Sequence, residues 1–172
     1  MVYVENKPGV LTRVASLFRR RAFNIDSLTV GRTEKPQVSR MTITVDADRD
    51  QARRIEANLY KLVNVLLVEN ITTAPAIVRD LAMIKVAATH EARSHVLELA
   101  SVFRARVVDV APESLIIEIT GGEDKIDGLL EVLRPFGVLE MTRTGRIAMT
   151  RGNDILRPPA QSPATNGKIS AA

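Results

Sequence analysis

VYVENKPGVL, residues Val2–Leu11, opens this chain of 172 residues with a short apolar strand pattern, a Pro-Gly turn and the start of a helix. A strand that runs through Asn6 into Pro8 and Gly9 leaves the first backbone amides of the next helix without partners. Such amides lie at the positive end of the helix dipole, where a small carboxylate can bind. Gly9 lets a ligand approach the backbone closely. The segment therefore predicts a β-strand followed by a ligand-binding loop.

The spacing of apolar residues predicts a β-α-β-β-α-β order for the first half of the chain. Val2–Glu5 is the first strand, and the turn Gly31–Pro36 separates the second strand from the third. The remaining elements are a helix with the apolar face Leu11, Val14, Leu17 and Phe18, a strand over Asn24–Val30, a strand with Met41, Ile43 and Val45 buried, a helix with Ala52, Ile55, Leu59 and Leu62, and a strand over Val65–Ile71.

The second half repeats this order at an offset of about 85 residues, as duplicated modules do. Its predicted elements are a strand over Leu81–Ala88, a helix with Val96, Leu97, Ala100 and Phe103, a strand over Val107–Ala111, a strand with Leu115, Ile117 and Ile119 buried, a helix with Ile126, Leu129, Leu130 and Leu133, and a last strand or strand pair over Leu139–Met149.

These patterns predict an α+β protein with two tandem ferredoxin-like βαββαβ domains, residues 1–73 and 78–152. In such a domain two helices cover one face of an antiparallel sheet, so the other face needs cover from the second half or from a second chain. Residues 153–172 are rich in Pro and small polar residues and have too little apolar content to pack. We expect a disordered tail there, with a partner-binding peptide as the alternative.

Composition excludes most catalytic classes. The chain has no cysteine, which excludes disulfides, thiolate catalysis and Cys-ligated zinc. His90 and His95 do not form a metal-spaced cluster, and helix capping explains the carboxylates around Asp48. Gly121-Gly122 lacks the spacing of a phosphate loop. We therefore expect no catalytic residues, no metal and no cofactor in this chain.

Charge and hydropathy bear on location and on nucleic-acid binding. No apolar run is long enough for a transmembrane helix, and the N-terminus lacks a signal-peptide core, so we expect a cytoplasmic protein without membrane contact. The net charge of +4 and the run Arg19–Arg21 suggest nucleic-acid binding. Basic residues at the end of a helix, where they complement its dipole, explain the run better. We expect no nucleic-acid partner.

Several linked motifs make the chain resemble the small, regulatory subunit of acetolactate synthase over residues 2–152. In the first half the motifs are Glu5–Val14, Phe18, Phe23–Leu28, Ser39–Thr42 and Tyr60–Val65, and in the second half they are Phe103–Val110, Glu113–Leu115, Arg134–Gly137 and Arg143–Ala148. Because these strings occur together and in register, the resemblance is specific.

The resemblance implies an amino-acid-binding ACT domain in the first half and a second ferredoxin-like domain after it. It also implies a non-catalytic subunit that binds and activates a large subunit containing thiamine diphosphate, magnesium and FAD. In this family ACT domains pair side by side into a homodimer, and valine binds at the pairing interface as a feedback inhibitor of branched-chain amino acid biosynthesis. The alternative is a stand-alone amino-acid sensor or an RNA-binding ferredoxin-like protein, although few aromatic residues are available for base stacking.

The chemistry of the first loop agrees with an amino-acid ligand. Amides of Gly9, Val10 and Leu11 can bind its carboxylate, and the side chain of Asn6 can accept from its ammonium group or bridge to its carboxylate. Val10, Leu11 and Ile25 can form an apolar wall around the side chain. The structural alternative for Asn6 is that it caps the helix, but the resemblance favours contact with the ligand.

Asn24 matches a family position at the start of the second strand, so we expect it to face the same end of the module and to reach the ligand or a partner chain. Its alternative is a turn residue that tolerates unusual backbone angles. The second half lacks an equivalent loop, because Ala88–Arg93 contains neither Gly nor Pro. We expect no valine pocket there and, from the family, a role in dimer support and in relay to the large subunit.

Overall fold

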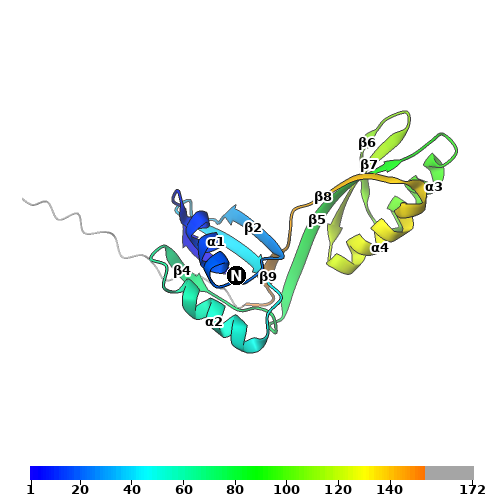
Figure 1. Ribbon diagram of the computed structural model, residues 1–172. Helices are drawn as coiled ribbons and strands as arrows, with labels where there is room; N and C mark the ends of the chain where they lie inside the picture. Colours follow the sequence, from blue (N-terminus) through cyan, green and yellow to red (C-terminus); the bar gives the residue numbers. More distant parts are fainter. Residues whose placement is uncertain (154–172) are drawn as a thin grey trace, which may run out of the picture.

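The computed structural model describes residues 1–153 and contains two βαββαβ halves joined by a long strand (Figure 1). The predicted tail lies outside the described residues except for its first position. The first half consists of β1 (Val2–Glu5), α1 (Val10–Arg20), β2 (Ser27–Arg32), β3 (Val38–Thr44), α2 (Arg49–Leu59) and β4 (Val65–Val68). The second half consists of β5 (Ala76–Ala87), α3 (Arg93–Val102), β6 (Arg106–Val110), β7 (Ser114–Gly121), α4 (Glu123–Leu133), a 3-10 turn (Arg134–Phe136), β8 (Val138–Arg143) and β9 (Ile147–Thr150).

The first sheet has the strand order β2-β3-β1-β4, and its helices pack on one face, as the fold class predicted. One side of α1 enters this core, but Leu11 remains 44% exposed, so its prediction as a core residue was wrong. On a helix Leu11 lies about 100° around from the buried Val10, which places it on the flank of the apolar stripe. The buried side of α1 is Val10, Val14, Leu17 and Phe18.

Several boundaries differ from the sequence pattern, and two of them have local reasons. β2 begins at Ser27 and not at Asn24, because the Asn24 side chain donates to the Asp26 carboxylate at 3.1 Å and holds a turn before the strand. α2 begins where Asp48 caps it: the Asp48 carboxylate accepts from the Gln51 amide, and the Gln51 side chain accepts from the Asp48 amide. The helix ends at Leu59, so Leu62, which was predicted on its apolar face, lies beyond it.

The second sheet has the matching order β6-β7-β5-β8, and the residues of its core are less exposed to solvent than those of the first core. The alternation predicted for β7 is confirmed, because Leu115, Ile117 and Ile119 are at most 1% exposed. Along α4 the buried positions recur at helical spacing. They are Ile126, Leu129 and Leu133.

One strand, β5, forms three ladders: with β7 and β8 in the second sheet, and with β9 outside that strand order. The last eight residues of β5, from Asp80 to Ala87, pair with β7 in the second sheet. Its first four residues, Ala76–Arg79, pair with β9 instead. The predicted last strand pair is therefore β8 and β9, but β9 leaves the second half and runs back towards the first (Figure 1).

The link between β8 and β9, Thr144–Arg146, contacts the first sheet, and we call it the brace. The Thr144 carbonyl accepts from Thr29 Oγ1 at 3.3 Å, and the Arg146 amide donates to Ser27 Oγ at 3.0 Å. Both partners of the brace, Thr29 and Ser27, belong to β2. Part of the face of the first sheet that the helices leave open is thus covered by the second half of the same chain.

Gly145, in the middle of the brace, gives a test of this packing. Its φ is +85°, and an added Cβ would lie 2.6 Å from Ser27 Oγ. We expect Gly145→Ala to lower the free energy of unfolding by roughly 2 to 3 kcal/mol, since backbone strain and a clash act together. Gly152→Ala is the control, because Gly152 has a φ of +77° and nothing within 4 Å. Chemical unfolding curves with equal losses for the two variants would contradict a packed brace.

Candidate functional site

The turn between β2 and β3 holds the predicted ligand loop in place through two hydrogen bonds. The Asn6 amide donates to the Gln37 carbonyl at 2.7 Å, and Asn6 Nδ2 donates to the Pro36 carbonyl at 2.9 Å. Asn6 is exposed, and its Oδ1 accepts no hydrogen bond from residues 1–153. The side-chain nitrogen is therefore used in positioning the loop, while the oxygen is free to accept from a ligand.

Gly9 is the N-cap of α1 and has the left-handed φ of +79°. The Val10 amide donates to the Lys7 carbonyl at 3.4 Å, so it is not the free donor that the sequence suggested. The amides of Gly9, Leu11 and Thr12 make no hydrogen bond within the described part of the chain. A Cβ on Gly9 would meet nothing within 4 Å, so the space above these donors is open. Unpaired amides beside open space are what an anion site at a helix start requires.

A polar network beside the loop was not recognised in the sequence. The side chain of Asn64, which is 8% exposed, accepts from Arg13 Nη1 and donates to Glu5 Oε2 at 2.5 Å. Lys7 Nζ contacts the other Glu5 oxygen at 3.1 Å. The hydrogen bond from Asn64, followed by that from Lys7, lowers the pKa of Glu5. Only the polarity of Asn64 within the apolar run Leu62–Leu67 could have signalled this network.

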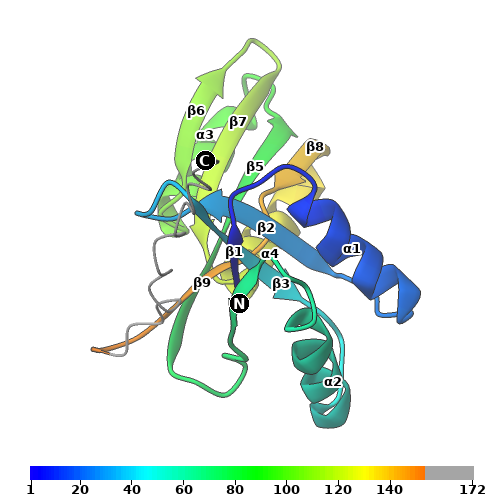
Figure 2. The same cartoon turned by 90° about the vertical axis from the view of Figure 1, so that its left-hand side faces the viewer.

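Asn24 and Ile25 lie at the opposite end of the first half from the loop, so the expectation that Asn24 faces the same end as Asn6 is wrong within one chain. β1 and β2 both pair antiparallel with β3, so they run parallel to each other. Figure 2 shows β1 leading up to the loop and α1 leading down from it. The 11 residues of α1 separate the two ends by about 16 Å.

The corresponding loop of the second half is filled by its own side chain. Arg93, at the start of α3, donates through Nη2 to the carbonyls of Ala88 (3.2 Å), Ala111 (2.7 Å) and Pro112. A guanidinium occupies the end of the module where the first half has an open Gly9. The two halves therefore differ at this end: the first has Gly9 with open space, and the second has the Arg93 side chain.

Two cavities lie away from the loop, and neither is lined by Asn6 or Gly9. One, of about 420 Å³, lies near the ends of β3, α2 and β4.

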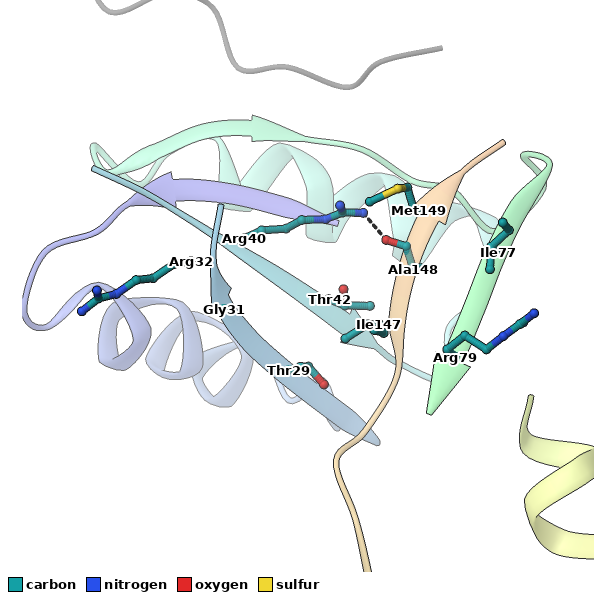
Figure 3. A pocket seen from close by; sticks show the side chains of 10 residues that line it. All are labelled: Thr29, Gly31, Arg32, Arg40, Thr42, Ile77, Arg79, Ile147, Ala148 and Met149. Carbon is teal, nitrogen blue, oxygen red and sulfur yellow. Dashed lines mark hydrogen bonds between the residues drawn. The ribbon is translucent and has the colours of Figure 1, made fainter. Parts of the chain in front are cut away.

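The other, of about 260 Å³, lies between β9 and the open face of the first sheet (Figure 3). There Arg40 points to the Ala148 carbonyl, to which it donates, and its guanidinium lies 5.5 Å from the ring of Tyr3. Arg32 and Arg79 point away from this cavity. The lining residues of the smaller cavity are Thr29, Gly31, Arg32, Arg40, Thr42, Ile77, Arg79, Ile147, Ala148 and Met149.

Within residues 1–153, no group of three or more His, Cys, Asp or Glu side chains is placed to hold a metal ion. The helices of this part of the chain are also too short and too polar for any of them to span a membrane.

Comparisons with known proteins agree with the fold. The family model "AHAS small subunit-like ACT domain" matches residues 1–67, and the model "Small subunit of acetolactate synthase" matches residues 79–152. A probable acetolactate synthase small subunit of Archaeoglobus fulgidus is 50% identical over 152 residues, which are 88% of this chain and 95% of that protein. The acetolactate synthase small subunit of Mycobacterium bovis is 48% identical over 151 residues, 88% of this chain and 90% of that one.

A crystal structure of the acetolactate synthase small subunit from Thermotoga maritima superimposes with a TM-score of 0.82. The two sequences are 41% identical, and the match covers 89% of this chain and 96% of that chain. The two family models together cover nearly all of the described residues, and the relatives match along almost their whole length. The chain belongs to the acetolactate synthase small-subunit family, the regulatory subunits of that enzyme.

Proposed function

We propose that this chain activates the catalytic large subunit of acetolactate synthase and withdraws that activation when valine binds at the ACT domain. The open loop with the free amides of Gly9 and Leu11, in a chain of this family, carries the proposal. Residues 1–73 sense valine, and residues 78–152 support and transmit. Thiamine diphosphate, magnesium and FAD belong to the large subunit, and both proteins act in the cytoplasm in the synthesis of valine, leucine and isoleucine.

A second copy of the chain completes the valine site. The loop residues Asn6–Gly9 are exposed in a single chain, and β2 is an edge strand of the first sheet. An edge strand presents unpaired backbone groups to another strand. Two β2 strands that pair about a two-fold axis perpendicular to the sheet run antiparallel. The Asn6 end of one chain then lies beside the partner's Asn24. Asn6 and Asn24 are far apart within a single chain, but pairing would bring them together from two chains.

The apolar surface along this edge supports such pairing. Val30 on β2 is 42% exposed, and Leu11 on the flank of α1 is 44% exposed. Figure 1 shows α1 lying on the same side of the first half as β2. Pairing along β2 would remove both side chains from water in each copy, which favours association through the hydrophobic effect.

The loop matches the three parts of a valine molecule. Its carboxylate binds the free amides of Gly9 and Leu11, and its ammonium group donates to Asn6 Oδ1. Leu11 and the partner's Ile25 contact the branched side chain. Val10 is only 4% exposed and belongs to the core, so it supports the wall from behind. Because the ligand touches two chains, it stabilises one arrangement of the dimer over another, as feedback regulation requires.

Gly9→Asp tests the site by placing a carboxylate beside that of the ligand. We expect at least about tenfold weaker valine inhibition, since charged hydrogen bonds of roughly 1.5 to 3 kcal/mol are lost. Gly9→Asn, which has the same shape and a similar backbone strain without the charge, should lose less. The measurement is acetolactate formation by the large subunit mixed with each variant during a valine titration. Unchanged valine sensitivity in Gly9→Asp would refute the site, and no activation by the unaltered chain would refute the regulatory function.

Pairing through β2 is tested with Val30→Glu. We expect this variant to be monomeric in sedimentation experiments and to bind valine weakly, because a charge buried at the edge opposes association. Val63→Glu is the matched control, since Val63 is 92% exposed on the turn after α2 and away from β2. A dimeric Val30→Glu variant would place the interface elsewhere.

The network beside the loop is tested through the pKa of Glu5. We expect Asn64→Ala to raise this pKa towards its ordinary value in an NMR titration, and Lys7→Met to raise it less, because the Asn64 hydrogen bond is the larger cause. Because the pKa of Glu5 is lower in the folded chain than in the unfolded chain, the ionised Glu5 carboxylate stabilises the fold at pH values above the ordinary Glu pKa. This stabilisation is lost as the pH falls through the lowered pKa. A larger shift in Lys7→Met would show that Asn64 does not hold Glu5.

A further inference from the structure

The helical layer of the first half carries a cluster of arginines that the valine site does not use. All are exposed, and α1 contains no acidic residue. They lie at the end of α1 and along α2, and we call them together the basic helical face. Its members are Arg19, Arg20, Arg21, Arg49, Arg53 and Arg54.

No member of this face forms an ion pair within residues 1–153. The ion pairs of the described chain join Lys7 with Glu5 and three arginines of the second half with acidic neighbours. On the basic helical face, Arg21 donates to the neutral Asn58 side chain at 3.3 Å. Like charges gathered on neighbouring helical turns repel one another. Asp50, at helical spacing from Arg53 and Arg54, forms no ion pair with either of them. The guanidinium groups of the cluster therefore remain available to an acidic partner.

The composition of the face fits a protein partner better than a nucleic acid. Along α2 the arginines at positions 49 and 53 share one side of the helix with Glu56 and with Tyr60, which is 49% exposed. Arginine and tyrosine are enriched where proteins meet, and the arginine fork binds carboxylates through two hydrogen bonds. Glu56 would face phosphate groups unfavourably.

Pairing through β2 would present two copies of this face together. A two-fold axis that joins antiparallel edge strands into one sheet is perpendicular to that sheet, so both helical layers lie on the same side. The open side of the sheet is taken in part by β9 and the brace. The helical side therefore remains as a broad, two-fold symmetric basic surface.

We propose that the basic helical face docks on an acidic surface of the catalytic large subunit. This inference rests on the proposed function, because that function requires such a partner. Because the basic helical face occurs twice in the dimer, one regulatory dimer would bind two equivalent acidic surfaces. The opposite charges would also speed the association of the two proteins. The second half, with its slight acidic excess and its ion-paired arginines, does not offer a comparable basic surface.

The test compares two double charge reversals in the full chain. Arg19→Glu with Arg20→Glu alters the basic helical face, and Arg134→Glu with Arg151→Glu alters two exposed arginines that form no ion pair in the described chain. Binding to the purified large subunit is measured by calorimetry at increasing salt. We expect the first variant to bind about tenfold or more weakly and with less salt dependence, while valine binding and the dimer are kept, and the second to bind as the unaltered chain.

Each other outcome overturns the proposal. Equal weakening by both variants would indicate an effect of net charge alone, and unchanged binding by the first would place the contact elsewhere. Failure of the unaltered chain to bind the large subunit would overturn the proposed function as well. In that case binding of single-stranded RNA that is lost in Arg19→Glu with Arg20→Glu would assign the face to nucleic acid instead.

Discussion

The double pairing of β5 is the constraint on which the rest of the structure depends. A strand whose first four residues pair with β9 and whose last eight pair with β7 cannot shift in one ladder without shifting in the other. A shift by one residue would also turn Ala82, Ile84 and Val86 out of the core, where they are not exposed at all. The register of the second core therefore fixes where β9 lies against the first sheet.

The two halves show how one fold becomes specialised at a single loop. In the first half Gly9 leaves the amides at the start of α1 open, and the Glu5–Asn64 network holds the strand that leads to them. In the second half Arg93 satisfies the carbonyls at the matching end with its own guanidinium. Duplication kept the strand order and the core, whereas the loop chemistry differs between the halves, as the proposed division into a binding module and a supporting one requires.

Sequence reasoning predicted what depends on local periodicity and missed what depends on distant contacts. The alternation of β7 and the stripe of α4 were readable because their apolar positions face one core with a fixed period. The role of Asn64 was not readable, because its partners Glu5 and Arg13 are more than 50 residues away in the chain. The division of β5 between two partners, and the end of the module at which Asn24 lies, follow from topology, which no local pattern contains.

The brace contacts the edge strand through which we propose that two copies of the chain pair. Ser27 and Thr29, which hold it, belong to β2, the same edge strand that would pair with the second copy. On the other side Arg146 pairs with Glu123 at the start of α4, and the Thr144 hydroxyl donates to the buried Asp80 at 2.9 Å. A displacement of β2 by a ligand in the interface must therefore move the brace or break its hydrogen bonds. Either response alters how the second half is held, which is the physical connection that the proposed relay from a valine site requires.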